Sequence, residues 1–273
     1  MRINNNLMAM NTHRQLGIAN NQGAKSMEKL SSGFRINRAA DDAAGLSISE
    51  KMRGQIRGLQ QASRNAQDGI SLIQTAEGNL NEVSAMLVRV RELATQAANG
   101  TYDADDDLAR IQEEVDELVD QIEDIKDNSE FNGIALLDGS ATTITLQIGA
   151  KDNQQLELNA ADFNLEAVHT SIAAFDLETQ AGAITALGEI EDLINEVSAA
   201  RSYLGANQNR LEHTIKNLDT YAENLQASES RIRDVDMANE MMELTKQNIL
   251  QQASTAMLAQ ANMAPQGVLQ LLG

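Results

Sequence analysis

The sequence of 273 residues contains no cysteine, no tryptophan and a single proline, and only 3% of its residues are aromatic. Without cysteine the chain has no disulfide, no zinc thiolate site and no cysteine nucleophile. A compact globular enzyme usually fills more of its core with aromatic side chains. Here the apolar residues are mostly Ala, Leu, Ile, Val and Met, which suit seams between helices, and proline hardly interrupts them. The composition therefore predicts a protein of long helices.

Positive charge is also scarce, and the formal charge of −19 is unevenly distributed. Residues 1–100 carry 12 Lys and Arg against 8 Asp and Glu, residues 101–200 carry 3 against 24, and residues 201–273 carry 6 against 8. Binding to nucleic acid needs a basic stripe that neutralises phosphates, which this chain lacks. The acidic middle is instead typical of a solvated outer surface.

Long hydrophobic runs are missing as well. The N-terminus lacks the apolar run of about 7 to 15 residues that marks a cleaved secretory signal. No stretch approaches the run of about 18 uncharged apolar residues that a membrane span needs. We therefore expect no membrane partner and, if the chain is secreted, a route without a cleaved signal.

Motifs of common enzyme sites are absent: G-x-G, a phosphate loop ending in GK before Ser or Thr, H-E-x-x-H and G-x-S-x-G. The three histidines, His13, His169 and His213, are far apart in the sequence, whereas metal and catalytic sites need clustered ligands. We therefore expect no enzymatic activity, no cofactor and no metal site.

One acidic pattern leaves a calcium site as an alternative. Asp103, Asp105, Asp107 and Glu114 match positions 1, 3, 5 and 12 of a calcium-binding loop. Position 6, where the turn needs glycine, is Leu108. A helix that starts here explains the same acids, and we favour that interpretation.

Two shorter patterns also have two interpretations. Asp41-Asp42 suits a paired-carboxylate site or a solvated, salt-bridging turn, and we favour the turn because adjacent side chains diverge too widely to share a proton. Asn99-Gly100-Thr101 fits an N-glycosylation sequon, but Asn-Gly is also a helix stop, which we favour.

The clearest periodic signal is a heptad run in the first half of the chain. Twelve positions alternate three- and four-residue steps without a polar side chain: Leu59, Ala62, Ala66, Gly69, Ile73, Ala76, Leu80, Val83, Leu87, Val90, Ala94 and Ala97. They predict a helix about 60 Å long that ends at Asn99-Gly100.

Two further runs predict helices that pack beside the first. One follows Asp105–Asp107 and comprises Leu108, Ile111, Val115, Leu118, Ile122 and Ile125. The other has three polar interruptions, Arg201, Gln208 and Glu229, and comprises Leu187, Ile190, Ile194, Val197, Leu204, Leu211, Ile215, Leu218, Ala222, Leu225 and Ile232. Three such seams close an elongated bundle.

Between these runs the hydrophobic period changes to two. Ile144, Leu146 and Ile148 alternate with polar residues, residues 149–153 form a turn, and the alternation resumes at Leu156, Leu158 and Ala160. This pattern predicts a β-hairpin, which needs the bundle for support because a lone hairpin is marginally stable.

Both ends of the chain have patterns that are compatible with helices, but their seams are weak. The N-terminal row combines small and polar residues with Met27: Ala9, His13, Leu16, Asn20, Gly23, Met27 and Leu30. The C-terminal row is similar: Val235, Ala238, Met242, Thr245, Ile249, Gln252, Ala256, Ala259 and Met263. We expect such seams to be poorly stable alone, so that the ends order by pairing with each other or with other subunits.

Several blocks of sequence resemble bacterial flagellin. They cover about residues 1–140 and 185–273 and stand in the flagellin order: KLSSGFRINRAADDAAGLSISEKMRGQIRGLQQASRNAQDGISLIQTAEGNLNEV, RVRELATQAANGT, EFNGIALLDG, LGANQNRLEHTIKNL, ESRIRDVDMANEMMELTKQNILQQASTAMLAQAN and PQGVLQLL. Little sequence separates the two regions, so the chain resembles a short form without the large variable surface domains.

The resemblance implies a structural subunit that self-assembles into the secreted, extracellular flagellar filament and supports motility. The alternatives are a hook-filament junction protein and a secreted flagellin-like adhesin. We expect a mainly α fold: an elongated antiparallel helical bundle or coiled coil with a small β-hairpin near residues 142–160. Residues 1–44 and 234–273 would pair as an inner-core domain in the filament, and residues 45–233 would form the outer-core bundle.

The resemblance also implies partners: other copies of the chain, filament cap and hook-associated proteins, and type III export with a chaperone that covers the C-terminal helix. The residues expected to bind the chaperone and form the filament core are Ile249, Ala256, Ala259, Met263, Leu269, Leu271 and Leu272.

A Toll-like innate immune receptor is a further partner that the resemblance implies. It would bind RVRELATQ through Arg89 and Leu93, helped by Glu114 on the neighbouring helix. The seam at Leu87, Val90 and Ala94 predicts that both side chains face away from the core. The alternative role for these residues is a contact between subunits.

Overall fold

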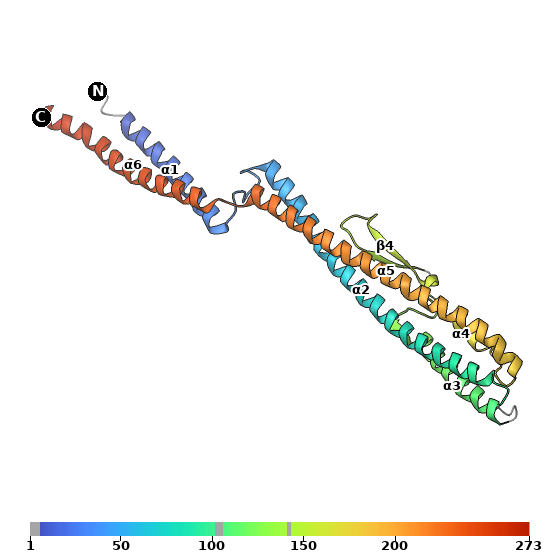
Figure 1. Cartoon of the computed structure of the whole chain (residues 1–273). Helices are drawn as coiled ribbons and strands as arrows, with labels where there is room; N and C mark the ends of the chain where they lie inside the picture. The colour runs from blue at the N-terminus through green and yellow to red at the C-terminus, as the bar shows by residue number, and fades with distance from the viewer. Residues whose placement is uncertain (1–5, 102–105, 141–142, 273) are drawn as a thin grey trace. The chain divides into compact units, whose positions relative to one another are not determined.

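The structure, a computed structural model, describes residues 6–101, 106–140 and 143–272, with side chains described as far as residue 264 (Figure 1). The chain divides into two compact units. We call residues 57–222 the middle unit and residues 1–56 with 223–273 the terminal unit. Two long helices, α2 (Ala43–Ala97) and α5 (Gln180–Arg233), contribute residues to both.

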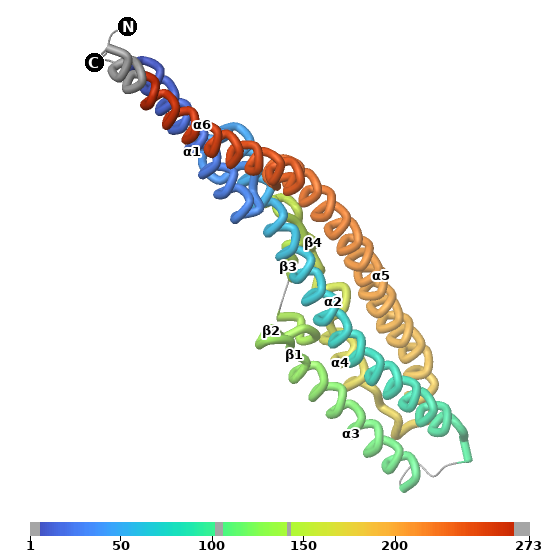
Figure 2. The backbone as a smooth tube through the Cα atoms, turned by 90° about the vertical axis from the view of Figure 1, so that its left-hand side faces the viewer, coloured from blue at the N-terminus to red at the C-terminus, as the bar shows by residue number. Residues whose placement is uncertain are grey.

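The middle unit is built on the predicted heptad seam of α2. All twelve seam residues are buried, which confirms the prediction, and Asn99-Gly100 follows the end of the helix. Helix α3 (Asp107–Asn128) lies along the last part of α2 (Figure 2) and buries Leu108, Ile111, Val115 and Ile122 as expected. The β-branched and leucine side chains of these rows form one part of the core.

Helix α5 buries a wider face than the sequence predicts. Ile190, Val197 and Leu204 are buried as expected, whereas Leu187 and Ile194 are only half-buried. A second row, which the heptad pattern missed, is buried beside the first: Ala183, Ala186, Leu193, Ala200 and Asn207. The face is wide because α5 also contacts the β-hairpin, through the Tyr203 hydroxyl, which accepts a hydrogen bond from the Asn159 backbone N–H at 3.1 Å.

The predicted β-hairpin is confirmed as β3 (Thr143–Gln147) paired antiparallel with β4 (Gln155–Asn159). Leu156 and Leu158 point into the core. The ring of Phe163 stacks on Tyr203 with centroids 6.4 Å apart. The hairpin is therefore held on the bundle by its apolar face, and Phe163, which follows the hairpin in the chain, adds an aromatic contact.

Residues 129–177 contain elements that the sequence did not indicate. A two-residue turn joins β1 (Glu130–Phe131) to β2 (Ile134–Ala135), with Asn132 and Gly133 at positive φ of 53° and 77°. A short 3₁₀ helix, η1 (Ala160–Asp162), leads to α4 (Glu166–Ile172). This segment buries a cluster of large apolar side chains: Phe163, Leu165, Val168, Ile172, Phe175 and Leu177.

The terminal unit contains α1 (Leu7–Ser32) side by side with α6 (Met237–Leu272) (Figures 1 and 2). Gly33, at φ 75°, ends α1 in the left-handed conformation that glycine adopts at little cost. The α1 residues turned toward α6 form a heptad row: Ala9, Thr12, Leu16, Ala19, Gly23, Ser26 and Leu30. The prediction was right for four of its members, but His13, Asn20 and Met27 are exposed.

The row of α6 that faces α1 differs from the predicted one. The least exposed residues follow heptad steps, and they include Glu240, Leu244, Gln247, Ser254, Leu258 and Ala261. The predicted row, including Met242, Ile249, Ala256, Ala259 and Met263, is exposed within the chain. Both rows have helical spacing, and the pattern of apolar residues favoured the more methionine-rich one, which faces outward.

Candidate functional site

The predicted receptor site places Arg89 of α2 beside Glu114 of α3. The Arg89 Nη2 and Nε atoms lie 2.7 and 3.0 Å from Glu114 Oε1, and Nη1 lies 3.1 Å from Glu92 Oε2. These hydrogen bonds raise the pKa of Arg89, with Glu114 as the larger cause. Both side chains of the Arg89–Glu114 pair are about half exposed, so they form an accessible charged group.

Leu93 does not face away from the core, contrary to the prediction. Its side chain is 2% exposed and belongs to the main core cluster. The prediction assumed that α2 packs on one partner, whereas α2 contacts both α5 and α3. A second row at seven-residue spacing, Leu72, Asn79, Met86 and Leu93, lies beside the seam and is the signal that the sequence analysis missed.

A second candidate surface is the outward face of α6 in the terminal unit. Ile249 is 61% exposed and Met263 is 63% exposed, and Ala256 and Ala259 are also exposed. Other large apolar side chains of the same helix are at least 44% exposed: Met237, Met241, Met242, Leu250 and Met257. The side chains of Leu269, Leu271 and Leu272 lie outside the described residues. Helix α1 adds exposed Leu7, Met8, Met10, Ile18 and Met27.

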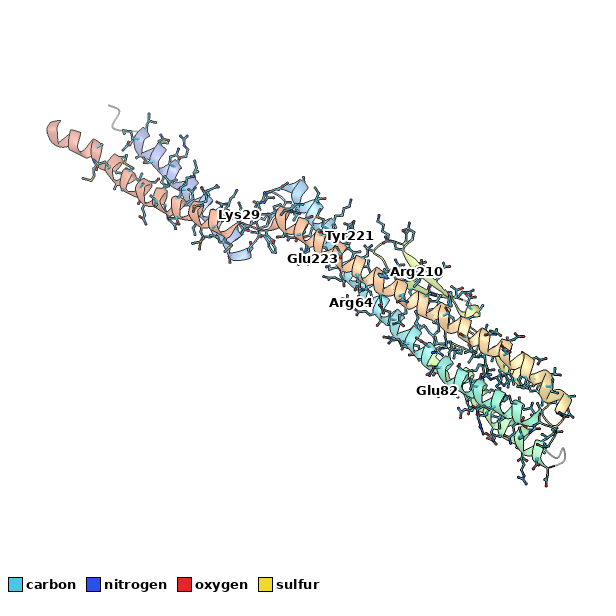
Figure 3. The ribbon with its side chains drawn as sticks, in the orientation of Figure 1. Lys29, Arg64, Glu82, Arg210, Tyr221 and Glu223 are labelled. Atoms are coloured by element: carbon cyan, nitrogen blue, oxygen red, sulfur yellow. The ribbon has the colours of Figure 1, made fainter. Side chains whose placement is uncertain are left out.

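Polar contacts fix how the two terminal helices pair. Lys29 lies on α1 toward α6 (Figure 3), with its Nζ atom 3.9 Å from Glu240 Oε2. The Asn6 side-chain amide donates to the carbonyl oxygen of Ala261 at 2.7 Å. Because low residue numbers of α1 meet high numbers of α6, the helices are antiparallel.

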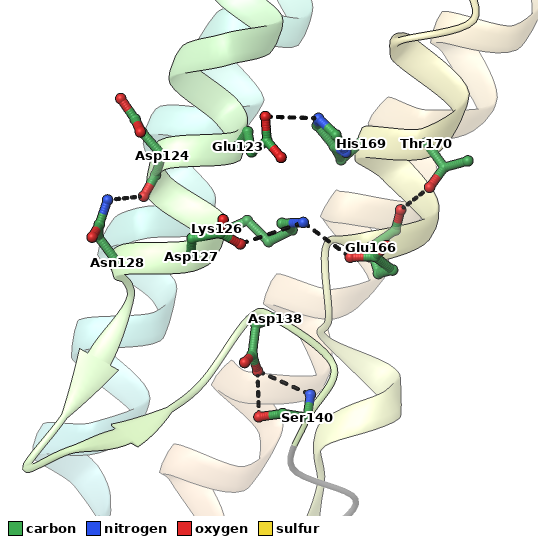
Figure 4. Close-up of polar contacts among 10 residues, drawn as sticks. All are labelled: Glu123, Asp124, Lys126, Asp127, Asn128, Asp138, Ser140, Glu166, His169 and Thr170. Atoms are coloured by element: carbon green, nitrogen blue, oxygen red, sulfur yellow. Dashed lines mark hydrogen bonds and ion pairs between the residues drawn. The ribbon is translucent and has the colours of Figure 1, made fainter.

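A cluster of charged groups in the middle unit lies between α3 and α4 (Figure 4). The nearly buried Lys126 Nζ atom lies 3.0 Å from Glu166 Oε2 and 3.4 Å from Asp127 Oδ1, and these contacts raise the pKa of Lys126. His169 Nε2 lies 3.8 Å from Glu123 Oε2. These groups face one another, so the cluster fastens α4 to α3.

A neighbouring carboxylate stabilises the turn that follows β2. Asp138 Oδ1 accepts hydrogen bonds from the Ser140 backbone N–H at 2.9 Å and from its hydroxyl at 2.8 Å (Figure 4). These bonds lower the pKa of Asp138.

The paired acids Asp41 and Asp42 form a turn, as the favoured interpretation predicts. Asp41 Oδ2 accepts hydrogen bonds from the backbone N–H groups of Asn37 and Arg38, which lower the pKa of Asp41. Asp42 Oδ1 accepts from the Gly45 N–H at 2.8 Å and so caps the start of α2.

Among the residues that the structure describes, no group of three or more His, Asp or Glu side chains is placed to hold a metal ion. Asp103 and Asp105 of the alternative calcium loop lie outside those residues. None of the helices described combines the length and the apolar character needed to cross a membrane.

Comparisons with known proteins agree with this arrangement of helices. Residues 3–142 match the bacterial flagellin N-terminal helical region, and residues 187–272 match the bacterial flagellin C-terminal helical region. The chain is 61% identical over 272 residues to a flagellin of Halalkalibacterium halodurans and 54% identical over 303 residues to a flagellin of Bacillus subtilis. Each alignment covers 100% of both chains.

A solved structure is also similar. The crystal structure of Bacillus cereus flagellin matches with a TM-score of 0.52 and 32% identity, over 61% of this chain and 94% of that one.

Proposed function

This chain belongs to the bacterial flagellin family, and we propose that its terminal unit becomes fully ordered only when subunits assemble. The chain is a structural subunit of the extracellular flagellar filament. Residues 1–44 and 234–273 form the inner core of the assembly in this proposal, and residues 45–233 form the outer bundle. The chain therefore acts by packing against copies of itself, without catalytic chemistry.

The exposed apolar side chains of α1 and α6 support this proposal most directly. Met8, Ile18, Ile249 and Met263 are each more than half exposed. In water such a surface is unfavourable, and burying it against a second copy gains roughly 25 cal/mol for each Å² of apolar area. Association then stabilises helices that are marginal alone.

Limited proteolysis of the monomer and of the filament tests this coupling. In the monomer we expect cleavage at both ends and a stable fragment near residues 45–232. In filaments the same bonds become protected. Purified monomer seeded with filament fragments elongates, and failure to elongate contradicts the role of the terminal unit. Equal protection of ends and middle in the monomer contradicts ordering on assembly.

We also propose that an export chaperone covers the outward face of α6 before assembly. Ile249, Ala256, Ala259 and Met263 are exposed together on this helix, and an amphipathic helix with such a face suits a hydrophobic groove. Leu269, Leu271 and Leu272 extend the proposal into residues whose side chains are not described. Filament cap and hook-associated proteins are proposed partners on the family resemblance alone.

Chaperone binding is tested by isothermal titration of the full chain and of a chain ending at residue 233. We expect binding to be lost with residues 234–273. Ile249→Glu weakens binding in the full chain, and Thr255→Glu, an exposed position about 120° around the same helix, is the matched control. Unchanged affinity of the shortened chain contradicts the assignment.

Finally, we propose that the Toll-like receptor for flagellin binds around Arg89 and Glu114. The half-exposed pair offers a directed charged surface on two adjacent helices. Leu93 contributes to receptor binding indirectly. It is buried in the core and helps to hold α2 against α3 near the charged pair. In this proposal the same residues also make subunit contacts in the filament. The receptor-binding surface is then buried in the polymer and accessible in the monomer.

The receptor proposal is tested with soluble monomer in a receptor signalling assay. Arg89→Ala and Glu114→Gln lower signalling while the thermal midpoint of the middle unit changes little, because the pair is solvent-exposed. Leu93→Met, which keeps the buried volume, signals normally, whereas Leu93→Ala lowers both stability and signalling. Undiminished signalling from an Arg89→Ala, Glu114→Gln double variant rejects the receptor role.

A further inference from the structure

A polar side chain occupies the centre of the seam between α1 and α6. Gln247 is 8% exposed and lies in the row of α6 that faces α1. Its Nε2 atom donates a hydrogen bond to Glu243 Oε1 on the same helix at 2.6 Å. Directly opposite stands Gly23 of α1, where an added Cβ atom would lie 3.8 Å from the Cβ of Gln247.

This contact fixes which residues stand level with one another. In an antiparallel pair with Gly23 level with Gln247, Ser26 stands level with Leu244, and Leu16 with Ser254. At each of these three levels a small side chain faces a larger one. Small residues also leave a groove of about 370 Å³ beside Gln247, whose lining includes Ala19, Gly23, Leu244, Gln247 and Gln251.

A slip by one heptad keeps the same faces together but breaks this complementarity. Gln247 would then stand level with Leu16 or Leu30, which places an amide against a leucine side chain. Gly23 would stand level with Ser254 or Glu240, and the first of these pairs leaves a void. Two large side chains at one level, or two small ones that leave a void, destabilise the seam. Burying an amide against an apolar side chain adds a further cost.

We propose that Gln247, together with Gly23, sets the register of α1 against α6. Gln247 is thus a positioning residue: a single polar side chain in a helical seam specifies register at a cost in stability. The inference rests on the proposed role of the terminal unit in assembly. One register fixes which exposed residues of α1, such as Met10 and Ile18, stand level with exposed residues of α6 such as Ile249, so that a second copy meets a single arrangement.

Replacing Gln247 by leucine removes the preference for a single register of α1 against α6. Leucine packs against Gly23 in the native register, and after a slip it can face Leu16 or Leu30 without the cost of placing an amide against a leucine side chain. Gln247→Leu therefore yields helices that pair in more than one register and present mismatched outer faces.

The absence of cysteine allows a direct test with engineered disulfides in assembled filaments. Leu16→Cys with Ser254→Cys reports the native register, because this pair is one heptad from Gly23 and Gln247. Leu16→Cys with Ala261→Cys reports a slip that brings Gln247 level with Leu30. One heptad displaces the helices by roughly 10 Å, and a disulfide requires Cα atoms within about 7 Å. Mild oxidation followed by non-reducing electrophoresis and peptide mass spectrometry identifies links within one chain.

With Gln247 present, we expect the native pair to cross-link and the slipped pair to remain unlinked. In the Gln247→Leu background, both pairs cross-link, and seeded filament growth falls. Thr245→Leu, an exposed polar position of α6, is the matched control and keeps the native pattern. Cross-linking of the slipped pair with Gln247 present, or no cross-linking of that pair in the Gln247→Leu background, overturns the proposal. A chain without substitutions that fails to elongate contradicts the assembly role itself, which separates the two failures.

Discussion

The middle and terminal units place similar apolar side chains in opposite environments. In the middle unit the twelve-residue seam of α2 is buried throughout, and further apolar layers come from α3, α4, α5 and the β3–β4 hairpin. In the terminal unit the facing rows contain Ser26, Gly23 and Gln247, while methionine, leucine and isoleucine point outward. The middle unit thus buries its most apolar side chains in its own core, whereas the terminal unit exposes many of its own.

The difference shows that a helix's strongest apolar row need not face its nearest helix. Pairing α1 with α6 through a weak row leaves the more apolar row exposed, and this is the row that we propose for assembly. In our proposal the α1–α6 pair is poorly stable alone, so that its order depends on neighbouring subunits.

The largest expected difference between the two units is at two isoleucines, one in each unit. Ile122 is 0% exposed in the middle unit, whereas Ile249 is 61% exposed in the terminal unit. Ile122→Ala lowers the free energy of unfolding of the monomer by about 2–5 kcal/mol. Ile249→Ala changes it by less than about 0.5 kcal/mol but slows filament growth. Urea unfolding followed by circular dichroism, with seeded elongation alongside, checks both. Equal losses of stability contradict the comparison.

Two helical glycines, one in each unit, should give a smaller difference in stability. A Cβ atom at Gly78 of α2 or at Gly17 of α1 would meet no other atom within 4 Å. Gly→Ala in a helix gains up to about 1 kcal/mol through backbone entropy. Gly78→Ala therefore raises the thermal midpoint of the monomer. Gly17→Ala leaves that midpoint unchanged and increases only the helical signal of the ends. A midpoint that rises with Gly17→Ala shows that the terminal helices already fold with the middle unit.

The smallest expected effect concerns acid stability of the middle unit. Hydrogen bonds from Ser140 hold the pKa of Asp138 below its ordinary value of 3.8. Their contribution to stability is therefore complete above that value and is lost as the pH falls through the lower, folded-state pKa. Asp138→Asn costs about 1 kcal/mol at neutral pH, and the difference from the unsubstituted chain shrinks below pH 3.8. A constant difference from pH 7 to acid excludes this carboxylate as the cause.

The sequence predicted the parts of the fold where one strong period dominates. The α2 seam and the β3–β4 hairpin are examples, since apolar residues there repeat without competition. It failed where one element packs on two partners: Leu93 is buried because α2 contacts α3 as well as α5. The β1–β2 turn and α4 are too short for a periodic signal, and Asn132-Gly133 was the turn motif that could have indicated the first.

For the candidate site, the sequence predicted the exposed charged pair through resemblance, but spacing alone could not bring Arg89 and Glu114 together. The outward face of α6 was identified by its apolar residues. Which of the two rows of α6 faces α1 depends on how its side chains fit against Gly23 and the neighbouring residues of α1. The sequence of α6 alone does not show that fit.

The stacked pair of Phe163 and Tyr203 has an optical consequence. The chain has no tryptophan, and its three tyrosines, at positions 102, 203 and 221, all belong to the middle unit. Ultraviolet emission and near-ultraviolet dichroism therefore report the middle unit, with Tyr203 sensing whether the hairpin is docked. The terminal unit is spectrally silent at tyrosine wavelengths. Ordering of the ends during filament growth should change the far-ultraviolet helical signal while the tyrosine bands reveal only what happens around positions 102, 203 and 221.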